Sequence, residues 1–155
     1  MDIIFRKRLK SKHLIVYKRE KMDDYWIEAD DFLIFHDLSH YAIEKTMGFT
    51  TAFFGLIKSG VKIKDFNDKA TRDKMHLTHE AWYAEGLANL ILIEYTQGEF
   101  ENFNEVFKSS LNKTNPTLPS LTISDKDLAE TRVLYTHLVK KWKALKEKQI
   151  MELAF

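Results

Sequence analysis

Residues 32–47 constrain the fold of this chain more than any other stretch. Asp30 and Asp31 precede the stretch, where either can cap a helix and favour its positive N-terminal end, and Gly48 follows it as a stop signal. Its apolar residues cover most of a helical circumference: Phe32, Leu33, Ile34, Phe35, Leu38, Ile43 and Met47. A helix that is apolar on most sides is buried rather than lying at the surface. We therefore expect these residues to form a largely buried core helix.

A pair of histidines lies on this expected helix, in the sequence His36-Asp37-Leu38-Ser39-His40. Side chains four residues apart lie on one helix face, so two imidazoles can reach a single metal ion, as in the H-E-x-x-H helices of zinc enzymes. Asp37 replaces the glutamate of that motif. The pattern predicts a divalent, zinc-like metal site with His36 and His40 as ligands. The alternative is a pair of neutral core histidines bonded to neighbouring side chains or carbonyls.

A metal site needs a third ligand, and Glu44 is poorly placed to supply it. His36, His40 and Glu44 span roughly 12 Å along the helix axis, too far for one ion to collect all three. Glu44 is better suited to supporting a ligand from behind. The third ligand should come from another helix, where Glu80 stands at the edge of a long apolar run and Glu85 within it. The pattern does not choose between these two, and two further histidines are reserve ligands: His76 and His79.

The chemistry expected of such a site is hydrolysis, because a bound ion acts as a Lewis acid and lowers the pKa of water towards about 7. Asp37 is then either the general base or a residue that orients a ligand, since its side chain is one methylene shorter than Glu and base catalysis depends on reach. The partner would be a small-molecule substrate of unspecified class, because the chain has no phosphate-binding loop, nucleotide fingerprint or nucleophile elbow.

The remaining sequence predicts an α+β fold. Two segments rich in β-branched and aromatic residues, 3–8 and 13–19, are typical of a hairpin, 25–28 of a third strand, and the alternating 150–155 of a strand that pairs with them. Further helices are expected at 52–58, 69–96, from 102 or 104 to 111, and from about 125 to 147, with 61–67 as a polar connector. We therefore expect a single domain, 1–155, in which a small antiparallel sheet packs on a bundle of four or five helices.

The amino-acid composition limits the kinds of site, the location and the partners that we expect for this chain. The chain of 155 residues has no cysteine, which excludes disulfides and thiolate metal sites, and no apolar run suited to a signal peptide or a membrane span. We expect a cytoplasmic protein without a membrane partner. Eight Lys or Arg against Asp2 and Glu20 give the first 21 residues a net charge of +6. Such a basic end can bind nucleic acid, but it is more often a solvated face, so we do not expect a nucleic-acid partner.

The residues around the histidine pair also carry two resemblances. His36-Asp37-Leu38-Ser39-His40-Tyr41 with Glu44 resembles a helix of the form H-D-L-x-H-Y-x-x-E in a group of small uncharacterised bacterial proteins. His36, Asp37 and His40 also resemble the signature of a zinc-binding ubiquinone-biosynthesis family, H-D-x-x-H followed after eleven residues by Glu. Ala52 stands at that Glu position here, so the resemblance implies the histidine ligands only. HD-type phosphohydrolases share His-Asp on a helix, but the upstream His13 falls in an expected strand, which argues against them.

Overall fold

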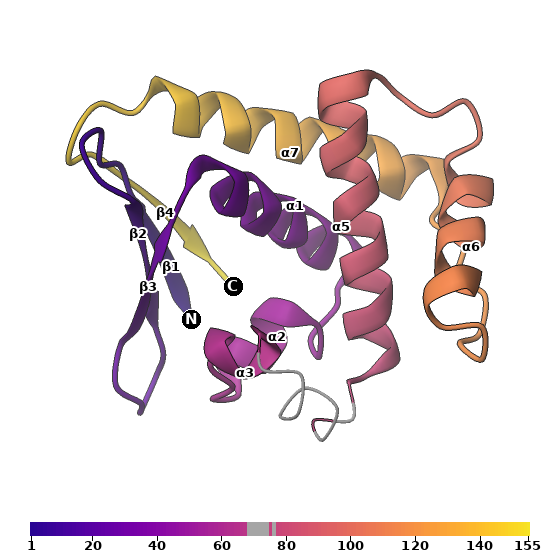
Figure 1. The fold of residues 1–155 in the computed structure, drawn as a ribbon, viewed down its shortest axis with the longest axis horizontal. Coiled ribbons are helices and arrows are strands. Elements are labelled where there is room, and N and C mark those ends of the chain that lie inside the picture. Colours follow the sequence, from indigo (N-terminus) through magenta and orange to yellow (C-terminus); the bar gives the residue numbers. More distant parts are fainter. Residues whose placement is uncertain (68–74, 76) are drawn as a thin grey trace.

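The computed structural model describes residues 1–67, 75 and 77–155, and it has the predicted α+β architecture (Figure 1). Four strands form one antiparallel sheet in the order β3-β2-β1-β4. They are β1 (Asp2–Arg6), β2 (His13–Lys18), β3 (Tyr25–Ala29) and β4 (Ile150–Ala154). The C-terminal strand pairs with β1, Asp2 opposite Ala154, which confirms that the two ends of the chain meet in the sheet.

One face of this sheet is the floor of the core. Every second side chain of a strand lies on that face. Its buried members are Ile3, Phe5, His13, Ile15, Tyr17, Ala29, Met151 and Leu153. The helices lie on this side of the sheet (Figure 1). The sheet therefore supports the helices that carry the candidate site.

Helix α1 (Asp31–Met47) is the buried helix that the sequence predicted. It packs against β3, α2, α5 and α7. Its first turn is capped by Asp30, whose carboxylate accepts the backbone N–H of Leu33 at 2.9 Å. It ends at Gly48, whose φ of +66° is the left-handed conformation typical of a helix stop. These two signals fix the length of the helix and so the place of the histidines within the core.

The other helices are α2 (Phe53–Lys58), α3 (Ile63–Asn67), α5 (His79–Gln97), α6 (Phe103–Thr114) and α7 (Asp125–Ala144). They differ from expectation in four places. Helix α6 ends at Thr114 rather than at residue 111. The predicted polar connector is wrong, because it contains α3, and α7 ends at Ala144 rather than near 147 because Leu145 is extended. The predicted start of the long helix at residue 69 is also wrong. Thr78 is extended and accepts the N–H of Ala81, so it caps α5; residues 68–74 and 76 lie outside the described residues.

The turn between α1 and α2 is held by carboxylates from other helices. Glu80 of α5 accepts the backbone N–H groups of Thr50 and Thr51, at 2.9 and 2.7 Å, and Glu44 of α1 accepts that of Phe54 at 3.0 Å. The turn is tight enough that a Cβ on Gly55 would lie 2.0 Å from the Thr50 carbonyl oxygen, so glycine is required there. These contacts bring α2 against the histidine pair.

Within residues 1–67, 75 and 77–155, no helix has the length and apolar character needed to cross a lipid bilayer.

Candidate metal centre

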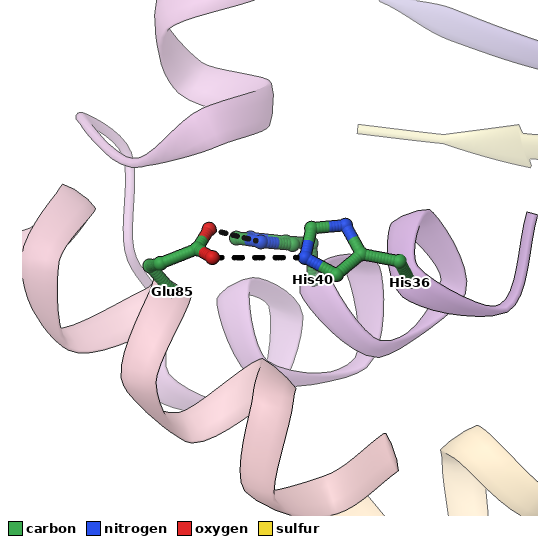
Figure 2. Close-up of side chains that lie close together, drawn as sticks. All are labelled: His36, His40 and Glu85. Atoms are coloured by element: carbon green, nitrogen blue, oxygen red, sulfur yellow. Dashed lines mark hydrogen bonds and ion pairs between the residues drawn. The ribbon is translucent and has the colours of Figure 1, made fainter. Parts of the chain in front are cut away.

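His36 and His40 of α1 point toward Glu85 of α5 (Figure 2). The Nε2 atom of His40 lies 3.2 Å from one carboxylate oxygen of Glu85, and the Nε2 atom of His36 lies 3.8 Å from the other. One ligand atom from each of the three residues can be chosen so that all lie within 4.8 Å of one another. Within the described part of the chain, this is the group of His, Asp and Glu side chains that could hold a metal ion.

The other ring nitrogen of each histidine faces a buried carboxylate. Nδ1 of His40 lies 3.4 Å from Oε1 of Glu44, and Nδ1 of His36 lies 3.8 Å from Oδ1 of Asp37. Asp37 and Glu44 are both almost fully buried. A carboxylate near Nδ1 of each imidazole favours the tautomer that carries its proton on Nδ1, which leaves Nε2 free to bind a metal. Carboxylates are common at this place behind metal-ligating histidines, where they form a hydrogen bond to the ring.

Asp37 is anchored from the sheet below. The buried hydroxyl of Tyr17 on β2 donates a hydrogen bond of 3.1 Å to Oδ2 of Asp37. Burial, followed by the nearby Asp37 charge, raises the pKa of Tyr17 well above its ordinary value, so the hydroxyl keeps its proton and remains a donor. Oδ1 of Asp37 has no hydrogen-bond partner, and neither has Nδ1 of His40. Buried polar atoms without a partner are costly, and here two of them lie next to the histidine pair.

The electrostatics favour charged imidazoles when no ion is bound. Burial opposes the charge on His36, but the carboxylates of Asp37 and Glu85 outweigh burial and raise its pKa to about 9. Burial likewise opposes charge on His40, and Glu44 with Glu85 nevertheless raises its pKa. Hydrogen bonds from His36 and His40 hold the pKa of Glu85 far below its usual range. The cluster therefore favours positive charge, whether protons on the imidazoles or a bound cation supply it.

The triad opens into a cavity of about 510 Å³. Helix α1 lines it with one face, formed by Leu33, His36, Asp37 and His40 at helical spacing, and α5 with Ala81, Trp82 and Glu85. The Glu85 side chain is 53% exposed, whereas that of His40 is 2% exposed. A ligand in the cavity could therefore reach the triad from the Glu85 side.

The structure brings Glu85, and not Glu80, to the histidine pair. The Glu80 carboxylate is engaged by the turn before α2, where hydrogen bonds from Thr51 and then Thr50 outweigh burial and lower its pKa. Asp37 lies beside His36 but outside the triad. Of the reserve ligands, His79 is exposed on α5 and contacts Tyr83, and His76 lies outside the described residues.

Two residues that contact the site are not among the residues predicted for it. Tyr17 occupies an inward position of β2. The alternation of the strand could have predicted that its side chain points toward the core helix, but not that its hydroxyl meets Asp37. Asn89 lies one turn beyond Glu85 and donates to Oε1 of Glu85 at 2.8 Å, which helps to orient that carboxylate. Their spacing on one helix face was the available signal.

Comparison of the chain with protein-family models, curated proteins and solved structures found no match.

Proposed function

We propose that the protein binds one divalent, zinc-like ion through His36, His40 and Glu85, and that it uses the ion in hydrolysis. The observation that carries the proposal is the double pairing of each histidine. Both Nε2 atoms face one shared carboxylate, and both Nδ1 atoms face buried carboxylates on their own helix. Two histidines and a glutamate are also the ligand set of a large class of catalytic zinc sites, in which a fourth position stays open.

The spacing of the ligand atoms supports the proposal. Ligands of a tetrahedral zinc ion lie roughly 3.3 Å from one another, given zinc–ligand distances of about 2.0–2.2 Å. The triad atoms already lie within 4.8 Å of one another, so a closure on the order of 1 Å by side-chain rotation would suffice. The charges of the site also support the proposal. The carboxylates of Asp37, Glu44 and Glu85 surround two imidazoles, and a bound cation would offset their excess of negative charge.

Asp37 has two candidate roles in this proposal. An ion at the triad would act as a Lewis acid that makes water a better nucleophile at neutral pH. Asp37 could accept a proton from such a water, or it could hold His36 in place through Nδ1. The positioning role is favoured because Oδ1 faces the His36 ring. The Asp37→Asn variant separates the roles: weaker metal binding indicates positioning, whereas unchanged metal binding with slower turnover indicates a base.

A non-catalytic α+β module is the competing function, and one observation favours it. Glu85 contacts both Nε2 atoms, so the three side chains can also serve as an ion network that ties α1 to α5. In that case the histidines serve the core, and a surface of the protein would bind a partner.

Metal analysis of protein purified without an affinity tag tests the proposal. We expect one equivalent of zinc, or of cobalt with a tetrahedral absorption spectrum, after reconstitution and dialysis. His36→Ala should lose the metal and remain folded, whereas His137→Ala, which removes an exposed histidine of α7, should keep it. Less than about a tenth of an equivalent in the wild-type protein would refute the metal site.

The hydrolytic part needs its own test, because metal can be bound without catalysis. We expect the zinc-loaded protein to hydrolyse p-nitrophenyl acetate faster than His36→Ala does, and His137→Ala to match the wild type. Equal rates in all three proteins would refute hydrolysis while leaving metal binding in place.

A further inference from the structure

The apolar residues that line the cavity indicate which kind of molecule can bind there. Among the described residues that line the cavity, four are polar, and all four belong to the metal centre: His36, Asp37, His40 and Glu85. We call these four residues the floor of the cavity and the apolar residues its walls. The other described residues that line it are aliphatic or aromatic, including Phe53, Phe66 and Trp82. At about 510 Å³ the cavity is within the ordinary size range of small-molecule sites, roughly 300–1,000 Å³. Of the described residues, those that would meet a bound molecule with polar groups are therefore confined to the metal centre.

The apolar wall begins directly at the triad. The ring of Phe53 lies with its centroid 5.0 Å from that of His40, and the ring of Phe66 lies 5.4 Å from that of Phe53. Trp82 and Ala81 lie one turn before Glu85 on α5, on the face that looks into the cavity. An apolar group attached next to a metal-binding atom would therefore be in contact with aromatic surface at once.

The charges at the floor argue against a highly anionic ligand. The carboxylates of Asp37, Glu44 and Glu85 more than offset the two charges of a divalent ion. The described residues that line the cavity include no Lys or Arg. A phosphate group gains most where Arg or Lys can pair with its oxygens. A single neutral or weakly acidic oxygen donor suits this floor better.

We infer that the site takes a small organic molecule with one metal-binding oxygen group, such as a carbonyl, joined to an apolar aliphatic or aromatic group that fills the cavity. The inference rests on the proposed metal function, since the ion holds the oxygen. The inference adds that the apolar group of the ligand determines which molecules bind tightly. Each methylene moved from water to an apolar wall raises the affinity about fourfold.

A series of alkyl hydroxamic acids tests the inference, because the hydroxamate binds the metal and the tail probes the wall. Binding of acetohydroxamic, butanohydroxamic and octanohydroxamic acid to the zinc-loaded protein would be measured by calorimetry. We expect affinity to rise with chain length, by at least about tenfold from the second to the third probe. Affinity that does not change with chain length, or inorganic phosphate that binds more tightly than octanohydroxamic acid, would overturn the inference.

Two variants assign the effect to this cavity. Ala81→Leu narrows it, and Trp82→Ala removes a wall residue that is not part of the core cluster. Both should keep one equivalent of zinc and bind acetohydroxamic acid normally, but should lose most of the gain from the longer tail. The matched control is Trp26→Ala, which removes a 60% exposed tryptophan from the outer face of the sheet. A control that loses the gain equally would overturn the inference.

The measured zinc content distinguishes failure of the proposed metal function from failure of the inferred ligand class. A wild-type protein without zinc refutes the proposed function. A protein with one equivalent of zinc and no dependence on the tail refutes only the substrate class.

Discussion

Replacing Glu44 by Gln tests whether the carboxylates behind the histidines serve a metal. Glu44 is 1% exposed, and its carboxylate faces both the start of α2 and the His40 ring. Oε2 accepts the backbone N–H of Phe54 at 3.0 Å, and Oε1 faces Nδ1 of His40 at 3.4 Å. The Gln amide has nearly the same shape and can still accept the N–H of Phe54. It cannot present a negative charge to the imidazole, which becomes a weaker ligand.

The expected effects on folding and on metal binding differ in size. Loss of the ion pair between Glu44 and His40 is partly offset because a buried charge is also removed, so we expect the unfolding free energy of the metal-free protein to fall by about 1 kcal/mol. Loss of the partner behind a metal-bound histidine typically weakens metal binding about 10- to 100-fold. A metal site therefore predicts a large loss of affinity with a small loss of stability.

Glu94→Gln is the matched control for this experiment. Glu94 is also a buried glutamate that accepts a backbone N–H, from Phe100 at 2.9 Å, and it pairs with Arg132 away from the triad. Competition with a zinc chelator gives the affinities, and urea unfolding of the metal-free proteins gives the stabilities. Glu94→Gln should lower stability and leave zinc affinity unchanged. If Glu44→Gln binds zinc as tightly as the wild type, the assignment of Glu44 as a support for His40 is refuted.

Three further predictions concern the supports of the site. Gly55→Ala should lower the unfolding free energy by about 3 kcal/mol in urea unfolding, because the new Cβ overlaps the Thr50 carbonyl; a loss under 1 kcal/mol, on the order of a surface change, would contradict this tight turn. Tyr17→Phe should cost about 1–3 kcal/mol, because it leaves the buried Asp37 carboxylate without its donor, and an unchanged thermal midpoint would contradict it. Glu80→Gln should cost about 1 kcal/mol near neutral pH, since the bonds are partly exposed to solvent. The lowered pKa of Glu80 means that its contribution is present above the unfolded value of 4.5 and is lost as pH falls. Urea unfolding at pH 7 and pH 3 should show the two proteins converging at the lower pH, and a constant difference would refute the assignment.

Local signals were sufficient for most of the fold. The apolar circumference of α1, with Asp30 before it and Gly48 after it, predicted a buried helix with nearly the observed ends. The alternating pattern of the last residues predicted β4, because it places Met151 and Leu153 on the same face of a strand, and both are buried. The start of α5 was missed because Lys69 and its neighbours have no Pro or Gly, so nothing nearby ended the helical pattern, whereas the actual cap is Thr78.

The site was predictable only to the extent that it lies on one helix. The spacing of His36 and His40 follows from helical geometry, and so does the support from Glu44 one turn later. The choice between Glu80 and Glu85 depends on how α5 crosses α1, which no local pattern encodes. Glu85 faces the histidines, and Glu80, five residues earlier, faces the turn before α2.

Helix α2 links the stability of the fold to the shape of the site. It has six residues and no side-chain cap of its own, and so short a helix is not stable alone. Glu44 and Glu80 satisfy the N–H groups at and before its start, so its position depends on α1 and α5. The same helix carries Phe53, whose ring forms the cavity wall beside His40. A change at Glu44 should therefore reach both the histidine and the wall, whereas a change at Glu80 should reach the wall alone.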